Sequence, residues 1–501
     1  MMGNQINWTA LSVFIFFFVL VTVMGFGASR WQQGAKKKGD AHLDEWGLGG
    51  RNFGTWITWF LVGGDFYTAY TVIAVPALVY AVGAYGFFAL PYTILVYPIV
   101  FVIMPKLWHA ASKAGHVTAA DVVYGRYGSR PLELAVAVTA VVATMPYIAL
   151  QLVGMEVVIK ALGLTGELPL AAAFVILALY TYSAGLRAPA LIAFVKDLMI
   201  YIVVLVAVVL VPIKLGGYSA VFSSASEAFA AKGGATGLLL QPQQMLPYAS
   251  LAIGSALAAF MYPHTLTGIF AAKSADTIRK NAVFLPAYTV LLGLIALLGY
   301  MAYAAKLDIK SNNDVVPALF NALFPPWFTG FAFAAIAIGA LVPAAVMSIG
   351  AANLFTRNFW KAYVKPDVTP AGEAKVAKIV SLVVKVGALV FILFLPTQFA
   401  LDLQLLGGVW ILQTFPAVVF GLFFNWFRAP ALLLGWAFGL IGGTTLAFMD
   451  GVKPVHTLVI GDGHYAVYTG LLALILNIVV GAVAELVMGF VKPRSAVVTA
   501  R

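Results

Sequence analysis

The stretch FLVGGDFYTAY, residues 60–70, places two adjacent glycines and an aspartate inside a long apolar segment. Glycine lets the backbone leave the helical path, and a carboxylate is costly in an apolar medium. A second apolar segment is interrupted by AAFMYPHTLTG, residues 258–268, which brings a proline and a histidine into its interior. The two interruptions predict two broken helices.

The composition predicts what surrounds these helices. Of the 501 residues 62% are hydrophobic and 10% are charged, which is typical of an all-α polytopic membrane protein and excludes a soluble globular chain. No cysteine is present, which excludes disulfides and thiolate sites. A segment of about 20 apolar residues can cross a bilayer. The sequence predicts thirteen transmembrane helices, at 7–27, 54–80, 84–105, 133–160, 167–184, 189–213, 247–266, 283–305, 327–354, 376–397, 400–424, 430–449 and 466–490.

The net charge of +11 is explained by the loops and needs no nucleic-acid partner. Alternate loops are basic, including RWQQGAKKKGDAH (30–42), AAKSADTIRK (271–280) and the tail KPRSAVVTAR (492–501). Because cytoplasmic loops collect Lys and Arg, these loops mark the inner face. We therefore expect the N-terminus outside and the C-terminus inside, with the lipid bilayer as a partner.

The two interruptions lie in the second and the seventh predicted spans, five spans apart. A unit of five spans is odd, so a second copy would enter the membrane upside down. Inverted repeats with matching broken helices indicate a secondary transporter whose site lies at the midplane. The alternative is that Gly and Pro are simply frequent in membrane helices.

Three motifs carry a resemblance to a known family: GGRNFGTWITWFLVGGD (49–65), YPHTLTGIFAAKS (262–274) and AAVMSIGAANLFTRNFW (344–360). They resemble the sodium:solute symporter family. The resemblance implies a single transporter domain over 1–501 with a LeuT-type core of two inverted five-helix repeats, 54–213 and 247–424. Residues 7–27 and 430–490 would form peripheral helices.

A narrower resemblance is carried by GLRAPALIAFVKDLMIY (185–201) and WILQTFPAV (410–418). These stretches are similar to bacterial monocarboxylate permeases, which import lactate, pyruvate and similar short acids. The resemblance implies a small monocarboxylate as substrate and the bacterial cytoplasmic (inner) membrane as location. A sodium-coupled symporter of another small solute, such as proline, pantothenate or a sugar, remains the alternative.

The sodium site of the family falls on positions that only partly suit a cation. The resemblance places its ligands at Gly63, Phe66, Ala345, Ser348 and Ile349, and Ile349 supplies no oxygen. No metal site is therefore predicted, and protons are the expected coupling ion rather than sodium. No cofactor is expected.

An ungapped alignment of the sixth span places Ala193 where relatives carry an aspartate and Lys196 where they carry a glutamine. We hypothesise that the Lys196 ammonium replaces sodium between Asp65 of the second span and Ser348 of the ninth, and that Lys196 exchanges a proton. The alternative is that Lys196 extends to the membrane interface. Asp197 points about 100° away around the helix and need not share this role.

Substrate binding requires donors for a carboxylate and a tight apolar wall. Spans that line the centre of this fold offer such groups at Gly64, Tyr67, Thr68, Tyr147, Gln151, Tyr262, Trp410, Gln413 and Thr414. His264 is interpreted as a packed imidazole. Neither an H-E-x-x-H nor a G-x-S-x-G motif occurs, and no filter loop is evident, so neither an enzyme nor a channel is predicted. The sequence does not indicate an oligomeric state.

Overall fold

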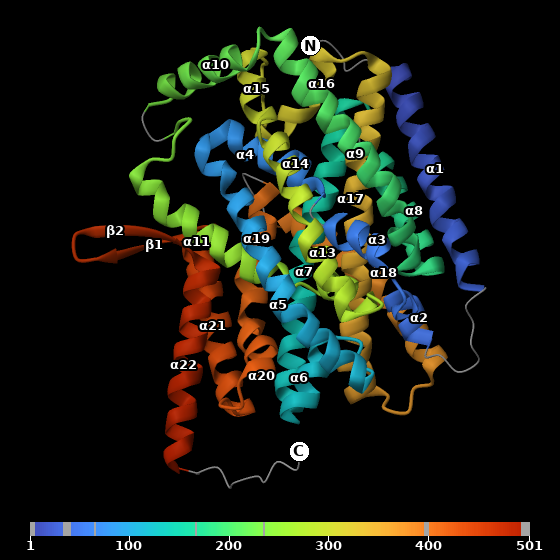
Figure 1. The fold of residues 1–501 in the computed structure, drawn as a ribbon, viewed down its shortest axis with the longest axis vertical. Coiled ribbons are helices and arrows are strands. Elements are labelled where there is room, and N and C mark those ends of the chain that lie inside the picture. Colours follow the sequence, from blue (N-terminus) through green and yellow to red (C-terminus); the bar gives the residue numbers. More distant parts are fainter. Residues whose placement is uncertain are drawn as a thin grey trace.

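The computed structural model describes residues 6–33, 42–64, 67–165, 168–233, 236–394 and 400–491. Asp65 and Phe66, both predicted to take part in coupling, lie outside the described residues. The helix α1 begins at one end of a tall helical bundle, and α22 ends at the opposite end (Figure 1). The helices up to the middle of the chain are α1 (Trp8–Gln33), α2 (His42–Leu48), α3 (Thr55–Thr58), α4 (Val75–Val82), α5 (Ala89–Ala114), α6 (Ala119–Tyr127), α7 (Arg130–Ala161), α8 (Leu168–Ala184), α9 (Arg187–Lys214) and α10 (Tyr218–Ala231).

The second half of the chain repeats this helical character. Its helices are α11 (Pro242–Ala259), α12 (Pro263–Ala271), α13 (Ala275–Phe284), α14 (Pro286–Ala296), α15 (Leu298–Ala304), α16 (Val315–Leu323), α17 (Pro326–Phe355), α18 (Pro370–Phe394), α19 (Ala400–Ile411), α20 (Gly421–Phe423), α21 (Ala429–Met449) and α22 (Thr469–Val491). Short 3-10 and π-helical segments join or extend them: η1 (Gly49–Arg51), η2 (Trp59–Gly63), η4 (Tyr70–Ala74), η5 (Ala84–Phe88), η6 (Asn312–Asp314), η7 (Thr356–Val364), η8 (Leu412–Thr414) and η9 (Pro416–Phe420).

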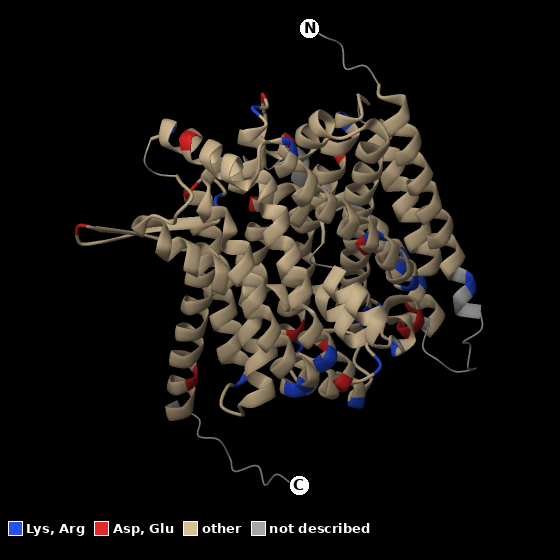
Figure 2. Ribbon diagram, turned by 45° about the horizontal axis from the view of Figure 1, so that its top comes forward, with Lys and Arg blue, Asp and Glu red and all other residues tan. Residues whose placement is uncertain are grey.

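Every predicted span corresponds to a helical segment, but the count of thirteen is not confirmed. By length and composition, eight helices in the described ranges can cross a membrane, or up to ten if each of two bent pairs is one span. The segment 54–80 is divided by its break, α8 has only 17 residues, and the segment 376–397 runs beyond the described part. Charged residues lie mainly toward the two ends of the bundle (Figure 2), as expected for membrane-spanning helices.

Both predicted breaks are present. The second span is helical up to Gly63 and is helical again from Tyr70. In the seventh span α11 and α12 are bent by 47°, and Pro263, which has no N–H to donate, begins α12. A third span bends by 40° before Pro416.

The centre of the bundle is α17. The most apolar 18-residue stretch of this helix is 100% buried, and the helix packs against α7, α9, α1 and α18. Among the eight spans, the smallest buried shares of the corresponding stretch are found in α1, α21 and α22, at 33%, 28% and 28%. Small residues such as Gly339 and Gly350 let neighbouring backbone approach α17 closely.

The described chain contains one β-hairpin in addition to its helices, although an all-α protein was predicted. β1 (Val455–Ile460) and β2 (Gly463–Tyr468) form an antiparallel hairpin that projects sideways from the bundle (Figure 1). The last predicted span therefore starts at Thr469 rather than at residue 466. Gly461 lies in the left-handed region at the turn, which glycine tolerates.

Candidate functional site

Lys196 of α9 lies against the break of the second span. Its ammonium donates hydrogen bonds to the carbonyl oxygens of Gly64 and Tyr67, the latter at 3.1 Å. The Lys196 side chain is 0% exposed, so the alternative that it extends to the interface is wrong. The two carbonyls are each one residue along from Gly63 and Phe66, which the sequence had suggested as cation ligands. A cation therefore occupies the broken backbone, and this cation belongs to the protein.

The third partner of Lys196 is its neighbour Asp197. The ammonium nitrogen lies 3.0 Å from one Asp197 oxygen, and the hydroxyl of Tyr288 in α14 donates to the other oxygen at 2.7 Å. Both charged side chains are fully buried. The sequence left two packing partners open for Asp197, namely Arg187 or a neighbouring span. Arg187 pairs with Glu45 at 2.8 Å, whereas the contact with a neighbouring span is present through Tyr288. The two residues start about 100° apart around the helix, but the long, flexible lysine side chain bends toward Asp197 and brings the two charged groups together.

Three tyrosines enclose this ion pair. The ring of Tyr67 lies 4.6 Å from that of Tyr288 and 5.7 Å from that of Tyr201, and the Tyr67 hydroxyl donates to the Tyr288 carbonyl oxygen at 3.3 Å. Tyr67, predicted to bind substrate, thus shields the pair and gives it its backbone carbonyl. Apolar ring faces around the pair strengthen its electrostatic attraction.

Ser348 is not among the partners of Lys196. Its hydroxyl donates to the carbonyl oxygen of Ala345 at 2.8 Å, within α17, and Ile349 is buried beside it. The Lys196 ammonium thus lies at the break, as hypothesised, but its counter-charge is Asp197 of the same helix and Ser348 of α17 is bonded within its own helix. Among the described residues, no group of three His, Cys, Asp or Glu side chains is placed to hold a metal ion.

The second half of the broken span is capped by two predicted substrate residues. The Gln151 amide oxygen accepts a hydrogen bond from the backbone N–H of Ala69 at 3.1 Å, and its nitrogen donates to the Tyr147 carbonyl oxygen at 3.4 Å. The Thr68 hydroxyl accepts from the N–H of Tyr70 at 3.0 Å. Both side chains accept hydrogen bonds from free backbone N–H groups at the start of this helical half, and such groups need partners inside a membrane.

A central cavity lies beside the second break. Its volume is about 10 Å³ and it is lined by Tyr92, Tyr147, Ala259, Tyr262, His264, Thr265 and Gln404. The Tyr147 ring contacts those of Tyr262 and His264 at 5.2 and 5.3 Å, so two predicted residues meet here. Tyr92, Thr265 and Gln404 were missed. A polar side chain inside an apolar span is the signal that would have found them.

Three predicted residues of the eleventh span lie elsewhere. The Trp410 indole donates to Thr444 of α21 at 3.1 Å. The Gln413 amide oxygen accepts from Asn477 of α22 at 3.2 Å. Both therefore face the C-terminal helix pair instead of the central cavity. Thr414 lines a separate inner cavity.

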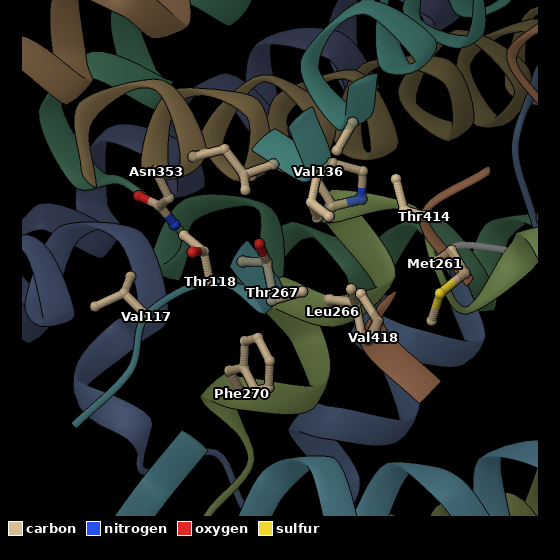
Figure 3. A pocket seen from close by; sticks show the side chains of 15 residues that line it. Val117, Thr118, Val136, Met261, Leu266, Thr267, Phe270, Asn353, Thr414 and Val418 are labelled. Carbon is tan, nitrogen blue, oxygen red and sulfur yellow. The ribbon is translucent and has the colours of Figure 1, made fainter. Parts of the chain in front are cut away.

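The inner cavity lies near the central one at the start of α12, because Met261 and Pro263 line it while their neighbours Tyr262 and His264 line the central cavity. It measures about 20 Å³. Figure 3 shows the side chains of Thr118, Thr267 and Asn353 gathered on one side of it, with Met261, Thr414 and Val418 on the other. It can hold about one water molecule.

Wider spaces lie beyond these two cavities. A vestibule of about 710 Å³ near α6 is lined by Lys106, His109, His116 and Arg126, and it shares Val418 with the inner cavity. An outer cavity of about 420 Å³ beside the hairpin contains Leu405, the neighbour of Gln404. The four spaces follow one another from the hairpin end to the α6 end. They trace a route across the bundle that is closed in the middle.

A polar cluster ties the elements at the vestibule end together. The Asn358 amide nitrogen donates to Asp121 of α6 at 2.7 Å and to Glu133 of α7 at 2.8 Å, and its oxygen accepts from the Thr118 hydroxyl at 2.7 Å. His116 lies in the loop before α6, where burial lowers the pKa of its imidazole. This end of the route is thus held by directional contacts.

Comparisons with known proteins agree with this geometry. The sequence model of the sodium:solute symporter family matches residues 46–439. A monocarboxylate transport permease protein of Rhizobium johnstonii is 74% identical, over 97% of this chain and 98% of that protein. The uncharacterized symporter YodF of Bacillus subtilis is 33% identical, over 95% and 93%. The structure of a Na⁺-coupled sialic acid symporter in its substrate-bound outward-open state shares the fold, with a TM-score of 0.77 at 14% identity over 96% of this chain and 98% of that one.

Proposed function

Because this chain belongs to the sodium:solute symporter family, we propose that it imports short monocarboxylates such as lactate and pyruvate together with protons, by alternating access and through Lys196. The chain is a multi-pass membrane symporter with the LeuT-type fold, and the family and its relatives are transporters rather than enzymes. The proposed setting is the bacterial cytoplasmic membrane, with the N-terminus outside and the C-terminus inside.

The observation that carries the proposal is the Lys196 ammonium on the Gly64 and Tyr67 carbonyl oxygens. A positive charge fixed there leaves the broken backbone no need for a sodium ion. A lysine amine binds and releases a proton, whereas a metal ion must enter and leave whole. The Asp197 carboxylate lies 3.0 Å from the Lys196 nitrogen as its counter-charge.

A monocarboxylate is supported by the name of the 74% identical relative and by the central cavity. Tyr262 is the residue before α12, and His264 and Thr265 belong to its first turn, so the N-terminal end of α12 meets that cavity. Helix N-termini favour anions. The basic residues of the vestibule would draw a released or entering anion in the same way.

The test is uptake of labelled lactate into proteoliposomes that contain the purified protein. One arm has an inward proton gradient without sodium, and the other has an inward sodium gradient at equal pH. Accumulation with protons alone supports the proposal. Accumulation that requires sodium refutes proton coupling and favours a sodium symporter, and no uptake of any short monocarboxylate refutes the substrate class.

Two variants separate coupling from folding. Lys196→Ala should abolish accumulation driven by the proton gradient yet retain exchange of labelled for unlabelled lactate. Lys385→Ala is the matched control, because Lys385 of α18 is also a buried lysine and, within the described ranges, donates to a carbonyl oxygen of its own helix, that of Ser381 at 3.2 Å. Lactate accumulation by Lys385→Ala should still be driven by the proton gradient. Proton-driven accumulation by Lys196→Ala would remove Lys196 from the mechanism.

A further inference from the structure

The Gln404 side chain is a buried acceptor that the protein does not use. Gln404 lies on α19, is 2% exposed and lines the central cavity. Its amide oxygen accepts no hydrogen bond from the part of the chain that the structure describes. Buried polar atoms are nearly always paired, and an unpaired one costs free energy. An atom of this kind in a cavity indicates a missing donor.

The Tyr262 hydroxyl, which bonds to the backbone of Gln404, does not supply that donor. The Tyr262 hydroxyl donates to the backbone carbonyl oxygen of Gln404 at 3.0 Å and so has given its only proton. This same bond holds the residue before α12 against α19. The start of α12 and the Gln404 amide therefore line one cavity together, so a donor that pairs with the amide lies close to the N-terminal end of α12.

The size of the cavity limits what the donor is. About 10 Å³ accommodates a group of the size of a water molecule or a hydroxyl. In a 2-hydroxy acid the hydroxyl is attached to the carbon next to the carboxylate, so the anion and the donor are close neighbours. An acid that lacks this hydroxyl would leave the amide oxygen of Gln404 unpaired in the bound state.

We propose that the Gln404 amide oxygen accepts a hydrogen bond from the 2-hydroxyl group of the substrate, so that the transporter selects 2-hydroxy monocarboxylates over acids of the same length without a donor. Pyruvate has no such donor, so lactate should be the better of the two substrates named above. This inference rests on the proposed function, since it assumes that a short monocarboxylate is the substrate. It goes beyond that function by assigning a specificity residue and a subclass of substrate.

The experiment compares lactate with propionate, which differ only in the 2-hydroxyl group. Labelled uptake of each acid and mutual competition are measured in proteoliposomes under the same proton gradient. In the unchanged protein, lactate should compete better than propionate by roughly 5- to 150-fold, the penalty for one unpaired buried acceptor. In Gln404→Leu the ratio should fall to near one, because lactate loses its acceptor and propionate no longer leaves one unpaired.

Two further variants keep the test sharp. Gln404→Met removes the acceptor with a side chain of similar length, and it replaces Gln404→Leu if the latter does not fold. Gln413→Leu makes the same chemical change in η8, directly after α19, but Gln413 faces Asn477, so this variant should leave the lactate-to-propionate ratio unchanged.

Equal competition by lactate and propionate in the unchanged protein overturns the inference while the proposed function stands. A ratio that survives in both Gln404→Leu and Gln404→Met overturns it as well. Failure to transport either acid refutes the proposed function and the inference with it.

Discussion

The buried pair of Lys196 and Asp197 makes a prediction about stability that a double-mutant cycle can test. Both side chains are 0% exposed and lie 3.0 Å apart. Lys196→Met leaves the Asp197 carboxylate with only the Tyr288 hydroxyl, and losing one partner of a buried ion pair costs about 3–5 kcal/mol. Asp197→Asn leaves an unbalanced ammonium and should cost a similar amount. Each single variant is therefore expected to be strongly destabilised.

The double variant Lys196→Met/Asp197→Asn removes both charges together. What remains is the lost donor for the carbonyl oxygens of Gly64 and Tyr67, about 1–3 kcal/mol for each unsatisfied group. Its cost should fall well below the sum of the two single variants.

The assay is unfolding in detergent at one pH, followed by the fluorescence of the 11 tryptophans. Apparent midpoints are compared at one heating rate, because unfolding of such proteins is often irreversible. If the midpoint shifts of the two single variants add up to the shift of the double variant, the two residues do not act as a pair and the reasoning is refuted.

Three further outcomes follow from particular contacts. Gly64→Ala should abolish proton-driven uptake while the protein still inserts, since a Cβ would lie 2.9 Å from both the ammonium nitrogen and a carboxylate oxygen of the buried pair; normal uptake would show that the pair yields easily. Asn358→Leu removes one hydrogen bond to each of the carboxylates of Asp121 and Glu133, which should destabilise the vestibule end by about 1.5–3 kcal/mol per lost bond, visible as earlier proteolysis of this region, and unchanged proteolysis would contradict the role of the cluster. Burial lowers the pKa of His116, although a nearby carboxylate opposes the effect, so its contribution to stability is present above its ordinary pKa of about 6.5 and is lost as the pH falls; melting at pH 7.5 and 5.5 should show a smaller difference in His116→Asn, and an equal difference would exclude this residue.

The breaks of the second and seventh spans were predictable because their cause is local. Two glycines at 63–64 and Pro263 alter the backbone wherever they stand in a helix. The position of Lys196 was predictable in the same way, since a lysine within an apolar span needs a partner inside the protein. Resemblance then indicated that the partner is the broken backbone.

The directions of the side chains were not predictable, because they depend on neighbours that are distant in the sequence. The eleventh span is apolar on all sides, so periodicity does not show which side faces the centre. Gln404 turns to the cavity, whereas Trp410 and Gln413 turn to α21 and α22. Gln151 was similarly read as a substrate ligand, while the structure uses its amide to cap the break.

Val418 lines both the inner cavity and the vestibule, so its side chain lies at the boundary that water or ions would have to pass between them. A valine side chain offers neither a donor nor an acceptor, so a file of hydrogen-bonded water ends at it. Apolar constrictions resist wetting and thereby block ions without any steric plug. An aliphatic side chain at this boundary thus resists a continuous file of water between the inner cavity and the vestibule, which keeps ions from crossing the bundle by that file.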